Sequence, residues 1–329
     1  MRWSLQAWPR GGASSTPSRR EVSTAAAAPL GALKAVLQVC GAAYGTLLTA
    51  AFVGQRRMLY FPDPTPPGDP VALGAPGCSS WRAVTRDGET VHGWYWPARG
   101  GADGGGGKKR LTVLLLHGNA GHRGHRLGWM SLMLYHLRCN VCIVDYRGYG
   151  GSTGSPSEAG LTQDGVAAVE WLLEAGHVQA VEREVVYWGE SIGTAVSVAV
   201  AEVHAPAAFI HQSGMSSIAE VAQSHVPLVM PRLLLLDKWN SRKRLGGLSS
   251  AWAGEGRAVP SLAIHGDKDG IVPFRFGKQL FASLPEPKRF YTVRGAGHND
   301  VEIVGGARYW DEVKAFLKDD VLGSIHADA

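Results

Sequence analysis

One serine lies in a sequence context that is typical of a nucleophile. Ser191 is the centre of Gly189-Glu190-Ser191-Ile192-Gly193, which fits the pattern G-x-S-x-G. The apolar run ending at Trp188 reads as a strand, and a helical pattern starts at Gly193. A strand-to-helix turn this tight strains the serine backbone by on the order of 1–3 kcal/mol and lifts its hydroxyl above the sheet edge. The pattern alone also fits a serine in an ordinary turn.

A serine hydroxyl needs a general base, and the histidines that follow Ser191 are the candidates. They are His204, His211, His225, His265, His298 and His326. His298 lies in a glycine-containing loop just past the last apolar run, where ligand chemistry collects in α/β sheets. His265 lies inside a predicted strand, which is typical of a packed histidine, and His326 lies near the C-terminus. We therefore expect His298 to be the base.

The base in turn needs a carboxylate that orients its ring, and two aspartates precede it at a suitable place. Asp267 and Asp269 both follow the strand that ends near His265. Asp267 could instead cap the turn around Gly266. Asp269 lies further along the loop, so we expect Asp269 to be the acid.

Acyl transfer also needs two backbone N–H groups that stabilise an oxyanion. One is expected from Ile192, the residue after the serine. The other is expected from the loop His117-Gly118-Asn119-Ala120-Gly121, with Asn119 favoured and Ala120 as the alternative. The same loop could also be a glycine-rich turn without such a role.

A metal or another cofactor is not expected. His117, His122 and His125 are close in sequence, but no carboxylate or thiolate lies near them at ligand spacing. Hydrolysis by a serine, a histidine and an aspartate needs no cofactor.

The elements that position these residues follow an α/β pattern, in which short apolar runs alternate with helical stretches. The predicted strands are Leu111–Leu116, Asn140–Asp145, Glu184–Trp188, Ala207–His211, Ser261–His265 and Lys288–Val293, after a hairpin of Trp81–Thr85 and Thr90–Trp96. The predicted helices lie near 123–138, 158–176, 192–204, 275–284 and 306–319. This alternation predicts a mostly parallel central sheet covered by helices on both faces. Residues 214–259 are too long for a simple connection, which predicts a helical insert.

The N-terminal part differs from this body. Residues 1–34 form a basic tail, and residues 1–29 fit a targeting segment or a plain disordered arm equally well. Residues 35–54 contain no charge and would span about 30 Å as a helix, which predicts a single-pass membrane anchor. The alternative is a buried helix of a soluble domain. Cations flank both ends, so orientation and compartment stay open. The hydrolytic domain would occupy residues 55–325.

Composition excludes several classes of protein. The net charge is +5, but the tail carries five cations against one acid, so the body is nearly neutral. A phosphate-binding surface needs more positive charge, which argues against nucleic acid as a partner. Four cysteines in 329 residues exclude a disulfide scaffold.

Taken together, the motifs resemble the α/β-hydrolase superfamily of serine hydrolases, and most closely its membrane-anchored members of the bud-emergence (Bem) type. The resemblance covers residues 55–320 and rests on several motifs in family order. These are Met58-Leu59-Tyr60-Phe61-Pro62, the loop 117–121 followed by Gly124-His125-Arg126, Val144-Asp145-Tyr146-Arg147-Gly148-Tyr149-Gly150, the serine motif, Ile271-Val272-Pro273 after Asp269, and Gly297-His298-Asn299-Asp300. It implies Ser191 as nucleophile, Asp269 as acid and His298 as base, and a structural role for Asp145 and Arg147.

The sequence departs from the family at two places. Thr194 stands where relatives often have glycine, and its side chain could crowd the packing of helix against strand. Some relatives remove palmitoyl groups from proteins and carry a cysteine-rich N-terminus, whereas Cys40 is the one cysteine in this N-terminal part.

The expected function is hydrolysis of an ester or thioester through an acyl-enzyme. Val226-Pro227-Leu228-Val229-Met230-Pro231 and Leu233–Leu236 could line a groove for an acyl chain, or pack as an ordinary cap. A lipid ester or thioester is therefore the expected substrate, and membrane lipid the expected partner of the anchor. The alternatives are a serine aminopeptidase, for which no carboxylate was found to hold the substrate amine, and a catalytically silent membrane scaffold.

Overall fold

The computed structural model describes residues 27–98, 110–225 and 232–323. Most of the predicted N-terminal tail, as well as the segment 226–231, lies outside the described residues. The chain divides into two compact units, one ending at Ala51 and the other beginning at Phe52. The residues that the sequence singled out for chemistry all belong to the second unit.

The first described element is the long helix α1, Ala27–Leu59. Its part from Leu30 to Leu59 is long and apolar enough to cross a membrane by length and composition, and it contains an 18-residue window with a mean hydropathy of 1.6. The helix contains the predicted span 35–54 and extends beyond it in both directions, so the span itself stays a prediction. Lys34 lies inside the helix because lysine is a good helix former, and a charge lowers hydropathy without breaking the helix.

Within the described part of the second unit, eight strands form one sheet in the order β10-β9-β8-β7-β4-β6-β3-β2. The strands are β2 (Ser79–Val84), β3 (Thr90–Trp96), β4 (Thr112–Leu116), β6 (Asn140–Asp145), β7 (Val185–Glu190), β8 (Ala208–Gln212), β9 (Ser261–Gly266) and β10 (Lys288–Val293). Neighbouring strands from β10 to β6 pair in parallel, whereas β3 is antiparallel to both β6 and β2. The predicted mostly parallel sheet is therefore confirmed.

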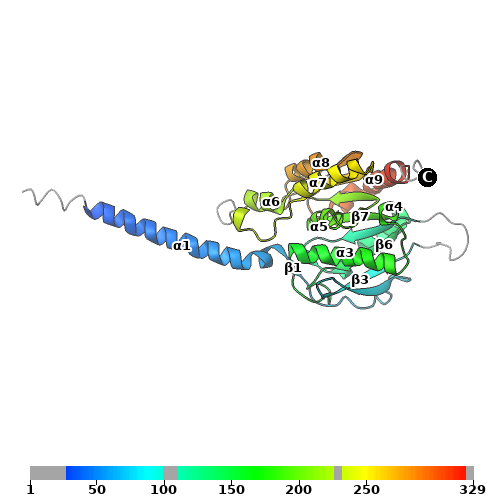
Figure 1. The fold of residues 1–329 in the computed structure, drawn as a ribbon, viewed down its shortest axis with the longest axis horizontal. Helices are drawn as coiled ribbons and strands as arrows, with labels where there is room; N and C mark the ends of the chain where they lie inside the picture. The colour runs from blue at the N-terminus through cyan, green and yellow to red at the C-terminus, as the bar shows by residue number, and fades with distance from the viewer. Residues whose placement is uncertain (1–26, 99–109, 226–231, 324–329) are drawn as a thin grey trace, which may run out of the picture. The chain divides into compact units, whose positions relative to one another are not determined.

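Alternate residues of each central strand pack into two different apolar layers, because successive side chains of a strand point to opposite faces of the sheet. Leu114 and Leu116 of β4 pack with the core of α3, α5, α7 and α8, whereas Val113 and Leu115 pack with α2 and α9. The helices are α2 (Leu127–Leu137), α3 (Glu158–Glu174), α4 (Val181–Glu184), α5 (Ile192–Val200), α7 (Ser241–Gly254), α8 (Phe274–Ser283) and α9 (Val301–Phe316). The sheet is thus covered on both faces, as predicted (Figure 1).

The predicted insert contains α6 (Ile218–His225), the short 3-10 helix η2 (Arg232–Leu234) and α7. Its middle contacts the last turns of α1. The side chain of Gln55 donates from Nε2 to the carbonyl of Leu234 and accepts the N–H of Leu236, and Arg56 forms an ion pair with Asp237. These contacts explain why the polar residues after the apolar run continue the helix to Leu59.

A second small sheet follows α1 directly. Strand β1, Phe61–Pro62, pairs in parallel with β5, Ala120–Gly121. The chain leaving α1 therefore lies beside the loop that follows β4.

Candidate active site

Ser191 lies at the sharp turn between β7 and α5, with a φ of 54°. A side chain on Gly193 would place its Cβ 1.9 Å from the carbonyl oxygen of Leu116, and one on Gly189 would come within 2.5 Å of the Thr194 backbone. The two glycines of the motif are thus required by close approach of the helix to the strands. The strained serine is the outcome expected for such a turn.

Thr194 does not crowd this packing. Its buried hydroxyl donates to the carbonyl oxygen of Ser191 at 2.7 Å, one turn back along the chain. The departure from the family pattern therefore adds a hydrogen bond to the turn that holds the serine.

His298 connects Ser191 with Asp269. Its Nε2 lies 3.0 Å from Oγ of Ser191, and its Nδ1 lies 2.7 Å from Oδ2 of Asp269. The three residues come from the loops after β7, β9 and β10, which meet because parallel strands place their carboxyl ends at one edge of the sheet. An imidazole between a hydroxyl and a carboxylate can accept the hydroxyl proton while the carboxylate stabilises the resulting cation.

The Asp269 carboxylate is held by several donors. Oδ1 accepts the N–H groups of Ile271 and Val272 at 2.9 and 2.7 Å. Burial disfavours the charged form, but hydrogen bonds from His265, His298 and the backbone outweigh it and lower the pKa of Asp269 below its ordinary value. The carboxylate is therefore ionised over the physiological range.

Asp267 has a different partner. Its Oδ1 accepts the N–H of Gly295 at 2.7 Å and so joins the loop after β9 to the loop after β10. The alternative was that Asp267 caps the turn around Gly266, whereas the bond of its side chain goes to Gly295 in the neighbouring loop.

His265 has a contact that the sequence interpretation missed. It is buried in β9 as expected, yet its Nε2 lies 3.2 Å from Oδ2 of Asp269 and 2.9 Å from the carbonyl oxygen of Val272. The i,i+4 spacing of His265 and Asp269 was the available signal. His265 fixes the orientation of the carboxylate that faces His298.

The loop 117–121 is held by two further residues that the sequence analysis did not single out. The Gly118 N–H donates to Oε2 of Glu190 at 3.1 Å, and the guanidinium of Arg126 binds both Glu190 and the carbonyl oxygen of Ala120. The Gly118 N–H is therefore engaged, and the N–H groups of Asn119 and Ala120 are the candidate oxyanion donors of this loop. Ile192 is the first residue of α5, where backbone N–H groups lack intrahelical acceptors.

A possible metal cluster lies just beyond this loop. Asp63, His122 and His125 each bring one ligand atom within 4.8 Å of the others, and sequence spacing missed the carboxylate of Asp63. However, Nδ1 of His122 accepts the Gly124 N–H, and Nδ1 of His125 accepts the His122 N–H. Each neutral ring then carries its hydrogen on Nε2, so that nitrogen offers no lone pair. This hydrogen bonding opposes metal binding.

Asp145 and Arg147 bind side chains and backbone groups from other parts of the chain. Asp145 accepts from the backbone and the guanidinium of Arg123, and Arg147 binds Asp164 and Asp87. These contacts agree with the structural role implied by the family resemblance.

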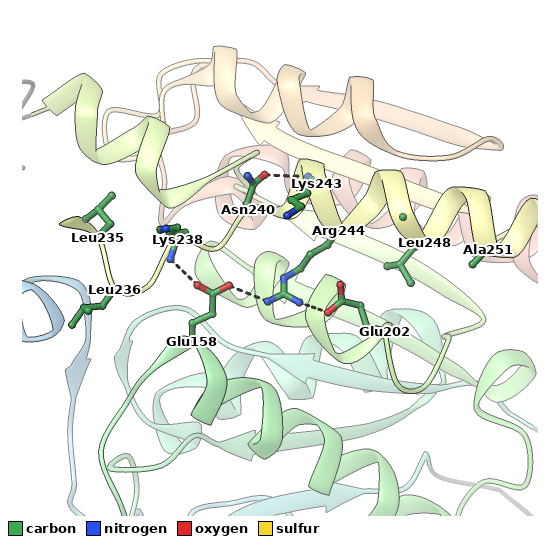
Figure 2. A pocket seen from close by; sticks show the side chains of 11 residues that line it. Glu158, Glu202, Leu235, Leu236, Lys238, Asn240, Lys243, Arg244, Leu248 and Ala251 are labelled. Carbon is green, nitrogen blue, oxygen red and sulfur yellow. Dashed lines mark hydrogen bonds and ion pairs between the residues drawn. The ribbon is translucent and has the colours of Figure 1, made fainter. Parts of the chain in front are cut away.

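A cavity of about 840 Å³ lies between the insert and α3 (Figure 2). Figure 2 shows Arg244 of α7 between Glu158 and Glu202, with which it forms ion pairs. Its lining contains none of the residues expected to carry the chemistry. The ion pairs across it join the insert to the body of the unit.

Comparisons with known proteins agree with this architecture. Residues 112–240 match the family model described as the alpha/beta hydrolase fold. An uncharacterised protein of Mycobacterium tuberculosis is 38% identical over 280 residues, which cover 84% of this chain and 92% of that protein. Protein bem46 of Schizosaccharomyces pombe is 32% identical over 66% of this chain and 70% of that protein. The human alpha/beta hydrolase domain-containing protein 17B is 31% identical over 65% and 68% of the two chains.

Solved structures share the fold at low sequence identity. An esterase of Pyrococcus furiosus superposes with a TM-score of 0.58 at 18% identity, covering 79% of this chain and 97% of the esterase. At this identity the likeness concerns the fold.

Proposed function

The chain belongs to the α/β-hydrolase family, as a protein of the Bem46 type, and on this premise we propose that it is a serine hydrolase of acyl esters or thioesters. The observation that carries the proposal is the position of His298, whose two ring nitrogens lie 3.0 Å from the hydroxyl of Ser191 and 2.7 Å from the carboxylate of Asp269.

The proposed reaction has two halves. Ser191 Oγ attacks the substrate carbonyl and gives its proton to His298 Nε2, while Asp269 stabilises the charged imidazole. The N–H groups of Ile192 and Asn119 stabilise the oxyanion. His298 then protonates the leaving alcohol or thiol, and an acyl-enzyme forms. His298 next takes a proton from water, the hydroxide attacks the acyl carbon, and the acid leaves as Ser191 regains its proton.

An acyl-chain substrate is supported by the position of the insert. Leu233 and Leu236 are 91% and 50% exposed, and the backbone beside them is bound by Gln55 of α1. At its other side, Nε2 of His225 in α6 lies 3.0 Å from the carbonyl oxygen of Ile271 in the Asp269 loop. The insert thus presents exposed leucines beside the end of α1 and also contacts the loop of the proposed acid, which favours a substrate with an acyl chain. The other predicted groove residues, 226–231, lie outside the described residues.

We also propose that α1 anchors the protein in a membrane as a single span. Extraction with carbonate at high pH tests this directly. The anchor is supported if the full-length protein stays with the membrane pellet, and release into the supernatant contradicts it.

The aminopeptidase alternative has less support. The carboxylate nearest the serine in sequence, Glu190, is already engaged by Arg126 and by the Gly118 N–H. It is therefore not free to bind a substrate amine.

Labelling with a fluorophosphonate probe tests the proposed nucleophile. Full-length protein in detergent should be labelled at one site, and Ser191→Ala should abolish the label. Ser250→Ala, at an exposed serine of α7, is the matched control and should label like the wild type. An unlabelled wild type would support the silent scaffold, and a labelled Ser191→Ala would contradict the assignment of Ser191 as the nucleophile.

Competition against the same probe tests the substrate class. Long-chain acyl esters and acyl thioesters should slow labelling more strongly than short soluble esters. Protection confined to short soluble esters contradicts the acyl-chain proposal, and protection by peptides with a free amine favours the aminopeptidase.

A further inference from the structure

Asn119 is held by the segment through which the chain leaves α1. We infer that this exit segment, Leu59–Pro62, together with Tyr149, positions the oxyanion-stabilising N–H groups of the loop 117–121. The inference rests on the proposed function, because it assigns these residues a task in the same reaction.

The first contact is made by the Asn119 side chain. Its Nδ2 donates to the carbonyl oxygen of Leu59 at 2.7 Å. Leu59 is the last residue of α1, and the final carbonyl groups of a helix have no intrahelical donor. Asn119 therefore satisfies the end of the apolar helix, and the helix end in turn restrains Asn119.

The second and third contacts hold the Asn119 backbone. Its carbonyl oxygen accepts the Phe61 N–H at 2.8 Å and the Tyr149 hydroxyl at 2.8 Å. That carbonyl belongs to the same planar peptide as the Ala120 N–H, and the two groups point in opposite directions in a trans peptide. Holding the Asn119 carbonyl therefore aims the Ala120 N–H.

The preceding peptide is restrained in the same way. Nδ1 of His117 lies 2.7 Å from the carbonyl oxygen of Gly118, whose peptide contains the Asn119 N–H. Burial lowers the pKa of His117 well below its ordinary value, so the ring is neutral and carries its hydrogen on the nitrogen that faces this carbonyl. The direction of each candidate N–H donor is thus fixed by a hydrogen bond to the carbonyl oxygen of the same peptide group.

The exit segment is itself anchored in the second unit. Phe61 and Pro62 pair with Ala120 and Gly121 as β1 and β5, and the buried Tyr60 hydroxyl accepts the indole N–H of Trp239 at 3.0 Å. A change at the end of α1 would therefore act on the oxyanion loop through hydrogen bonds that run directly between them. Removal of an oxyanion donor typically costs 10²–10³-fold in rate, and misalignment costs part of that.

The test measures the inactivation of full-length protein in detergent by a fluorophosphonate probe, separating the maximal rate constant kinact from the half-saturating concentration KI. Tyr149→Phe removes one hydroxyl and keeps the ring, and Asn119→Ala removes the bond to Leu59 and keeps both N–H groups. Each variant should lower kinact about tenfold and leave KI and the final labelled fraction unchanged. Tyr135→Phe is the matched control, because Tyr135 is 77% exposed on α2.

Three outcomes decide the inference. Wild-type kinact in both variants overturns it. A lower labelled fraction with wild-type kinact in the remaining sites also overturns it, because that result reports misfolding. If Ser191→Ala is labelled like the wild type, the proposed function itself fails. If Ser191→Ala is not labelled but Tyr149→Phe and Asn119→Ala are labelled with the wild-type kinact, the positioning role alone is refuted.

Discussion

Oδ2 of Asp269 lies 2.7 Å from Nδ1 of His298, although the two residues are separated by 29 positions in the chain. Asp267, two residues earlier, faces Gly295 instead. Of the two aspartates that the sequence left as candidates, Asp269 is thus the one with the geometry of the acid.

This pair of aspartates allows a matched test. Asp269→Asn should lower kcat by about 10⁴-fold, because an amide cannot hold the imidazole in the required tautomer. Asp267→Asn should stay within a few-fold of wild type. Fluorophosphonate labelling rates and ester hydrolysis measure both variants, and an inactive Asp267→Asn beside an active Asp269→Asn would reverse the assignment.

Arg147 should contribute to stability through a buried carboxylate. Burial raises the pKa of Asp164 to about 6 even though Arg147 hydrogen-bonds to it. Arg147→Ala would leave that carboxylate without its cation, which typically costs about 3–5 kcal/mol. Urea unfolding at pH 7 measures the loss.

Arg86→Ala is the control for this measurement, because Arg86 pairs with Glu170 at the exposed surface. Its removal should change the unfolding free energy by less than about 1 kcal/mol. Equal losses in Arg147→Ala and Arg86→Ala would contradict the importance of the buried pair.

Gly193 should not tolerate a methyl group. A Cβ at Gly193 would lie 1.9 Å from the Leu116 carbonyl oxygen, so Gly193→Ala should destabilise the protein by about 3 kcal/mol or more and reduce labelling of Ser191. Gly128→Ala, on an exposed turn of α2 with open space around it, should be neutral or stabilising by up to about 1 kcal/mol. Thermal unfolding compares the two, and a stable, fully labelled Gly193→Ala would contradict the packing described for the turn.

His211 should make stability depend on pH. Both ring nitrogens are buried without hydrogen-bond partners in the described structure, and burial lowers the pKa of His211 to about 3. Between its ordinary value of 6.5 and about 3, the unfolded chain binds a proton that the native histidine does not. Stability therefore falls as the pH falls through this range, by about 2 kcal/mol between pH 7 and pH 5.

His211→Phe keeps a ring that can stack on Phe209 and removes the titrating group. Its unfolding free energy should depend less on pH than that of the wild type, so the difference between the two proteins should grow by about 2 kcal/mol from pH 7 to pH 5. Parallel urea titrations at the two pH values are sufficient. Equal pH dependence of the two proteins would assign the effect to other groups.

Much of the architecture was predictable from the sequence. The strand Lys288–Val293 and the hairpin strand Thr90–Trp96 have the predicted bounds, and the mostly parallel sheet and the family are confirmed. These features depend on neighbouring residues, since strand, turn and helix patterns repeat over two to four positions. The motif around Ser191 is local only in part, because Gly189 is required by the approach of Thr194 within the turn, whereas Gly193 is required by the approach of Leu116 in β4.

Tertiary structure decided the contacts between distant parts of the chain. The bond of Asp267 to Gly295, the bond of His298 to Asp269 and the bond from Asn119 to Leu59 each depend on which loops the strand order brings together. Likewise, α1 continues past its apolar run because residues about 180 positions later bind Gln55 and Arg56. Local sequence patterns carry no information on such pairs. The distance between two residues that are far apart in the chain is set by how whole helices and strands pack, and not by the residues next to either of them.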